Sequence, residues 1–69
     1  MAGGVSWNWR LPLWAYLRFQ ELVNLLEYTD VYDDEAYTYR DEIRSLPGFP
    51  REAHPDRDLI YFEITDRRH

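Results

Sequence analysis

The stretch that decides the fold is the apolar segment "LWAYLRFQELVNLLEY" at residues 13–28. It contains no glycine or proline, and Pro12 precedes it where a first helical turn tolerates a residue without an N–H. Six apolar residues recur with the spacing of one broad helical stripe, namely Ala15, Tyr16, Phe19, Leu22, Val23 and Leu26. The segment therefore predicts a helix over residues 13–28.

Two segments near the ends of the chain have the pattern of strands. In "VSWNWR", residues 5–10, apolar and polar side chains alternate with the period of a half-buried strand. In "LIYFEIT", residues 59–65, branched and aromatic residues predominate. Between the second strand and the helices, "LPGFPREAHPDRD" at residues 46–58 has the composition of an irregular connection.

A second helix is predicted over residues 32–46. Its core side would carry residues spaced at i, i+4, i+7, i+11 and i+14, which are Tyr32, Ala36, Tyr39, Ile43 and Leu46. Asp33 and Asp34 suit the positive end of the helix dipole, and Pro47-Gly48 supplies a stop. The alternative is a hairpin, because "YTDVY" and "AYTYR" are rich in strand-forming residues. We favour the helix.

These elements predict a single α+β domain over residues 1–69, of order β-α-α-β. The two helices are expected to pack on a small antiparallel sheet formed by the terminal strands. Because two strands are barely a sheet, an open edge is expected to recruit a third strand from residues 27–32 or to pair across a dimer.

Composition limits the compartments and the chemistry that we consider. The 69 residues include twelve aromatic side chains and no cysteine, which allows one compact core and excludes disulfides and thiolate metal sites. Neither a signal sequence nor a membrane-spanning run is present, so we expect a cytoplasmic protein.

The formal charge of −5 is concentrated in one third of the chain. Residues 21–42 hold eight carboxylates against the single cation of Arg40. Such a field repels nucleic acid and anionic membranes and attracts basic surfaces. We therefore expect a basic protein partner, with neither direct nucleic-acid binding nor membrane binding.

No motif for catalysis, metal binding or cofactor binding is found. A calcium loop needs a glycine and a second oxygen ligand, but the acidic stretch has no glycine and Tyr32 stands at the ligand position. His54, Asp56 and Asp58 lie close together, but the prolines on both sides of His54 indicate a turn. We expect a protein that is not an enzyme and holds no cofactor or metal.

The acidic stretch "EYTDVYDDEAYTYRDE", residues 27–42, is the candidate partner-binding surface. If residues 32–46 are helical, Asp34, Asp41 and Tyr37 point away from the core and Glu42 lies on the flank. The predicted partner-binding residues are Asp30, Asp33, Asp34, Glu35, Tyr37, Asp41 and Glu42.

In character, this stretch resembles the small acidic phage-encoded inhibitors that mimic DNA, anti-CRISPR proteins among them. The resemblance covers about a quarter of the chain and includes no specific motif. It implies binding to the DNA-recognition surface of a bacterial defence complex. We therefore expect a non-enzymatic inhibitor, a monomer or weak homodimer in the bacterial host cell, that blocks a basic DNA-binding surface of a protein partner. Antitoxins and small regulatory subunits share this character.

Two other interpretations stay open. The acidic face is also what a small protein needs for solubility alone. In addition, three apolar residues of the first helix, Trp14, Leu17 and Leu25, fall outside its stripe. With the strand edge they are the expected interface of a structural or assembly subunit, or of an antitoxin.

Overall fold

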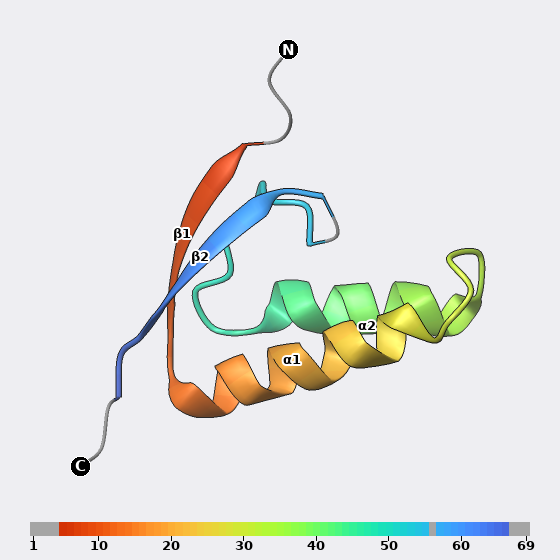
Figure 1. Cartoon of the computed structure of the whole chain (residues 1–69), viewed down its shortest axis with the longest axis horizontal. Helices are drawn as coiled ribbons and strands as arrows, with labels where there is room; N and C mark the ends of the chain where they lie inside the picture. The colour runs from red at the N-terminus through yellow and green to blue at the C-terminus, as the bar shows by residue number, and fades with distance from the viewer. Residues whose placement is uncertain (1–4, 56, 67–69) are drawn as a thin grey trace.

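The fold is a small α+β arrangement of order β-α-α-β (Figure 1), described by a computed structural model for residues 5–55 and 57–66. The elements are strand β1 (Ser6–Leu11), helix α1 (Leu13–Glu27), helix α2 (Asp34–Ser45) and strand β2 (Leu59–Ile64). The prediction of a second helix instead of a hairpin is confirmed. Residues 27–32 form the end of α1 and a turn, so the expected third strand from this segment is wrong.

The two strands pair in parallel, and the prediction of an antiparallel sheet is wrong. The register runs from Ser6 opposite Leu59 to Leu11 opposite Ile64. At the start of the ladder, the Leu59 amide donates to the carbonyl of Val5 at 3.1 Å. Both strands therefore begin at the same end of the sheet.

The parallel direction results from the path of residues 46–58. The two helices run in opposite directions and return the chain to the end of β1 (Figure 1). Instead of turning there into β2, the chain runs back along β1. It is held first by Trp9, whose indole Nε1 donates to the Pro47 carbonyl at 2.8 Å.

Gly48 allows this close approach between the connecting segment and β1. Its φ is +74°, a left-handed conformation that favours glycine. A Cβ at this position would lie 2.8 Å from the carbonyl oxygen of Arg10. Glycine is therefore required both by the backbone conformation and by the contact.

Asp58 fixes the other end of the connecting segment. Its Oδ2 accepts a hydrogen bond from the Trp7 indole at 3.0 Å and another from the His54 amide at 2.8 Å. These contacts place the start of β2 beside the start of β1.

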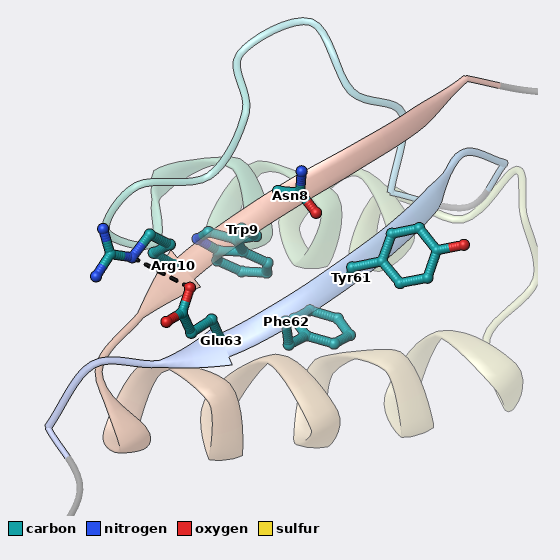
Figure 2. A pocket seen from close by; sticks show the side chains of 6 residues that line it. All are labelled: Asn8, Trp9, Arg10, Tyr61, Phe62 and Glu63. Atoms are coloured by element: carbon teal, nitrogen blue, oxygen red, sulfur yellow. Dashed lines mark ion pairs between the residues drawn. The ribbon is translucent and has the colours of Figure 1, made fainter.

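Trp9 is the centre of the core, which lies between the sheet and the two helices (Figure 2). Its ring is fully buried and meets Phe19 and Phe49 edge-on, with centroids 5.3 and 4.9 Å apart. The other buried apolar residues are Leu11, Ala15, Leu22, Ala36, Ile43, Leu46, Phe49 and Ala53. Neither of the two helices is long and apolar enough to cross a membrane, as judged on the described residues.

Candidate functional site

Five exposed carboxylates lie in or beside the turn between α1 and α2, namely Glu27, Asp30, Asp33, Asp34 and Glu35. Figure 1 shows this turn at the end of the molecule away from the sheet. We call this surface the acidic end and define it by Glu27, Tyr28, Asp30, Tyr32, Asp33, Asp34, Glu35, Tyr37 and Asp41. It includes every predicted partner-binding residue except Glu42. These residues belong to one continuous part of the chain, which begins at the end of α1 and extends along α2 as far as Asp41.

Asp30 organises the turn. Its Oδ1 accepts the amide of Tyr32 at 3.0 Å, and its carbonyl accepts the amide of Asp33 at 2.9 Å. Asp33 is then the N-cap of α2, with Asp34 and Glu35 in the first turn of the helix. Carboxylates at this position are stabilised by the helix dipole, so part of the acidic end has a structural reason to be acidic.

Three tyrosines of the acidic end are strongly exposed. Tyr28 is 90% exposed, Tyr32 86% and Tyr37 59%. The prediction that Tyr32 belongs to the core is wrong, because the Asp30 turn ends before α2 begins and leaves Tyr32 outside the helix. Tyr39, which was also predicted to be in the core, is half-buried and packs against it.

Glu42 differs from the other predicted site residues because its carboxylate is already paired. The Arg18 guanidinium donates to both of its oxygens, at 2.5 and 2.9 Å, and thereby joins α1 to α2. The pKa of Glu42 is lowered by these hydrogen bonds from Arg18. Glu42 therefore holds the two helices together, and we leave it out of the acidic end.

Asp41 and Tyr37 border a hollow that also contains cations. The hollow, about 350 Å³ in volume, is lined by Tyr37, Arg40, Asp41, Arg44 and His54. The acidic end thus passes into a surface of mixed charge along α2. This places the strongest negative charge at the turn and the first turn of α2, around Asp30, Asp34 and Glu35.

The outer face of the sheet forms a second hollow, of about 510 Å³ (Figure 2). Its lining residues are Asn8, Arg10, Tyr61 and Glu63, whose side chains share the outer face, together with Trp9 and Phe62, whose side chains point toward the helices. The only charged groups in it, Arg10 and Glu63, lie 3.4 Å apart and neutralise each other. The hollow was not predicted from the sequence, although the alternation along both strands indicates that Asn8 and Arg10 share one face with Tyr61 and Glu63.

The hollow along α2 brings His54 and Asp41 to one surface with Tyr37, whereas the charged groups of the hollow on the sheet are the ion pair of Arg10 and Glu63. Within residues 5–55 and 57–66, no three His, Asp or Glu side chains are placed to hold a metal ion. The predicted turn around His54 is held by the Asp58 carboxylate, which accepts the His54 amide, and by the His54 carbonyl, which accepts the amides of Arg57 and Asp58.

The α1 helix also exposes apolar residues. Trp14 is 58% exposed, Leu17 52% and Leu25 40%. These are the residues outside the buried stripe, which faces the sheet and α2. The helix is therefore apolar on a side that the described part of the chain leaves exposed.

Compared with known protein families, with curated proteins and with solved structures, the chain has no match. The resemblance to DNA-mimic inhibitors stays a prediction based on character. The function is therefore argued from the surfaces described above.

Proposed function

We propose that the protein is a non-enzymatic binding protein whose acidic end occupies a basic, DNA-binding groove of a protein partner. In this role its carboxylates take the places of DNA phosphates, and the protein inhibits its partner by competition. The proposed setting is the bacterial cytoplasm, as for phage-encoded anti-CRISPR proteins.

The observation that carries this proposal is the exposure of Tyr28, Tyr32 and Tyr37 among the carboxylates. A face that serves solubility needs carboxylates but has no use for three exposed aromatic rings. Tyrosine is enriched at the centres of protein interfaces, where its ring supplies contact area and its hydroxyl a hydrogen bond. The combination of rings and carboxylates supports binding over solubility alone.

The charge distribution adds a second support. Grooves that hold duplex DNA are lined with Lys and Arg, because the duplex carries about one charge per 1.7 Å of its axis. The acidic end presents several carboxylates over a turn and one helix face, and no arginine lies between residues 19 and 39. Charge complementarity of this kind speeds association and selects the partner.

The test is capture of basic proteins by the immobilised protein, followed by competition with duplex DNA. A bacterial lysate is passed over the protein at low salt, and the column is washed with duplex DNA. We expect retained proteins to be released by the DNA and by moderate salt, because both compete for the same cations.

A matched pair of charge reversals makes this test specific. Asp34→Arg reverses a charge within the acidic end, and Glu52→Arg reverses one on the exposed part of the connecting segment. Asp34→Arg should abolish the DNA-sensitive retention, whereas Glu52→Arg should preserve it. Equal retention by both variants would show that the acidic end is not the binding surface.

A second candidate function is that of an assembly subunit with an apolar interface. The exposure of Trp14 and Leu17 on α1 favours it, because large apolar side chains side by side are typical of contact surfaces. Association through this surface should resist salt and be lost in Trp14→Ser. Sedimentation at low and high salt distinguishes this function from the first.

A further inference from the structure

The two edges of the sheet differ in how they are closed. Residues 46–53 cover the edge of β1, where Leu46, Phe49 and Ala53 are buried. The edge of β2 has no such cover from the described residues. As a result Phe62, in the middle of the row that faces the helices, is 39% exposed.

Backbone groups of β2 point out of the sheet along this open edge. In a parallel ladder, alternate residues direct both their N–H and their C=O to the neighbouring strand. Leu59 and Thr65 donate to β1 at the two ends of the ladder, so the odd-numbered residues face β1. Ile60, Phe62 and Ile64 therefore face outward, and within the described residues no hydrogen bond reaches their backbone groups.

β2 has none of the features that normally protect an edge strand. Lysine, proline and bulges prevent pairing at natural edges, and β2 contains none of them. Its single charge, Glu63, lies on the outer face and pairs with Arg10 of β1 at 3.4 Å. The edge is thus a template for a further strand.

The helix layer is wider than the sheet that it supports. Packed helices lie about 8–10 Å apart and strands about 4.8 Å apart, so two helices span the width of about four strands. Figure 2 shows α2 behind β1, while α1 runs past β2 on the side away from β1. The Tyr16 ring, 5.3 Å from the Phe62 ring, marks where α1 meets this edge. An added strand would lie over α1.

The face of α1 beside this edge has a defined chemistry. The spacing i, i+4, i+7 and i+11 places Tyr16, Gln20, Val23 and Glu27 on it. A hollow of about 230 Å³ is lined by Phe19, Gln20, Val23 and Asn24. The hollow holds apolar and amide groups, and none of its lining residues is basic.

Carboxylates lie at both ends of this face. Glu27 ends α1, and Asp66, just beyond β2, accepts the amide of Leu13 at the start of α1 through its Oδ1. An extended segment that enters here therefore needs apolar side chains for the hollow and cationic side chains near its ends.

A second copy of this chain does not fit the site by symmetric pairing of β2 with β2. The two-fold axis of such a pair is perpendicular to the sheet, so all helices would lie on one face. Because α1 extends past β2, the α1 helix of each copy would enter the space of the other copy's helices. The occupant must lack a helix layer at this edge.

We propose that the outer edge of β2 and the adjoining face of α1 bind an extended segment of a protein partner, with apolar residues at alternate positions and basic residues near its ends. The segment adds a third strand to the sheet. Its backbone forms hydrogen bonds with the N–H and C=O groups of Ile60, Phe62 and Ile64 that point out of the sheet. Its side chains cover Phe62 and the α1 hollow. This site shares only Glu27 with the acidic end, and its apolar hollow and strand edge do not depend on the other residues of that surface.

The test uses a phage-displayed library of random ten-residue peptides, selected on the full-length protein. We expect enrichment of peptides that alternate apolar residues and contain Lys or Arg. Binding of a selected peptide should slow hydrogen exchange at the amides of Ile60, Phe62 and Ile64 by about tenfold or more. No enrichment, or enriched peptides that leave these three amides unchanged, would overturn the proposal.

A pair of opposite charges at Gln20 tests the α1 side of the site. Gln20 is exposed, so the fold tolerates both variants. Gln20→Arg should weaken binding of the selected basic peptides by about tenfold, and Gln20→Glu should strengthen it a few-fold. Ser45→Arg, exposed at the end of α2, controls for net charge and should bind as the wild type does. Equal effects of the two Gln20 variants would contradict the proposed chemistry.

Discussion

The indole of Trp7 donates a hydrogen bond to the carboxylate of Asp58 across 51 positions of the chain, with 3.0 Å between Nε1 and Oδ2. This contact joins the first strand to the last residue before the second. Asp58 also accepts the amide of His54, so one carboxylate closes the connecting segment and positions the start of β2. The direction of the sheet depends on this residue.

We predict that Asp58→Asn destabilises the fold at neutral pH and removes part of its acid sensitivity. The pKa of Asp58 is lowered, first by the hydrogen bond from the His54 amide and also by that from Trp7. A carboxyl group with a lowered pKa stabilises the fold above its unfolded pKa of about 3.9 and loses this effect as the pH falls through its folded pKa. Urea unfolding at pH 7 and below pH 4 measures the free energy of unfolding at each pH. The difference between the two values should be smaller for the variant than for the wild type.

The matched control is Glu52→Gln, which removes an exposed carboxylate of the same segment. This variant should show the same difference in the free energy of unfolding between the two pH values as the wild type. If Asp58→Asn does the same, Asp58 is not the group that connects pH to stability.

Gly48 is predicted to be the most restrictive backbone position of the connecting segment. Gly48→Ala should lower the free energy of unfolding by about 1–3 kcal/mol, because it forces a side chain into a left-handed conformation. Its Cβ would also approach the Arg10 carbonyl to 2.8 Å. Urea denaturation measures the loss.

Gly48→Asn separates these two causes. Asparagine tolerates the left-handed conformation better than alanine but carries the same Cβ. If the contact with Arg10 dominates, the two variants should be equally destabilised. Recovery of stability in Gly48→Asn would assign the loss to the φ angle alone.

Trp9 is predicted to contribute through its ring and its N–H separately. Trp9→Phe keeps an aromatic ring but leaves the Pro47 carbonyl without its donor, which should cost about 1–3 kcal/mol. Trp9→Ala should cost about 3–5 kcal/mol, enough to unfold a domain of marginal stability. Trp14→Phe, at a residue 58% exposed, is the control and should change stability by less than about 0.5 kcal/mol. Thermal unfolding followed by circular dichroism measures all three.

The sequence was sufficient to predict where the helices and strands lie along the chain, but not the relative direction of the two strands. Periodicity identified both helices, because apolar residues spaced along a helix must share one face. The direction of β2 depends on contacts of Trp7 and Trp9 with the connecting segment, and no local pattern reports contacts so distant in sequence.

The sequence also predicted only part of the candidate site. The acidic stretch was identified from charge alone, and its carboxylates do lie on the surface. Tyr32 was assigned to the core because it lies four residues before Ala36, but the side chain of Asp30 forms a turn that excludes it from α2. The pairing of Glu42 with a residue of α1 required the packing of the two helices to be known.

Glu42 and its neighbour Asp41 are predicted to differ in their contribution to the stability of the fold. Arg18 binds both oxygens of Glu42, so Glu42→Gln should lower the urea midpoint at pH 7, whereas Asp41→Asn should leave it nearly unchanged. Arg18→Lys should also lower the midpoint despite keeping the charge, because lysine cannot donate to both oxygens in the planar geometry of a guanidinium. The pKa of Glu42 is lowered by Arg18, so its contribution should disappear as the pH falls through the folded pKa of this carboxyl group. An Asp41→Asn variant as destabilised as Glu42→Gln would mean that both carboxylates hold the helices together, and Asp41 would then leave the acidic end.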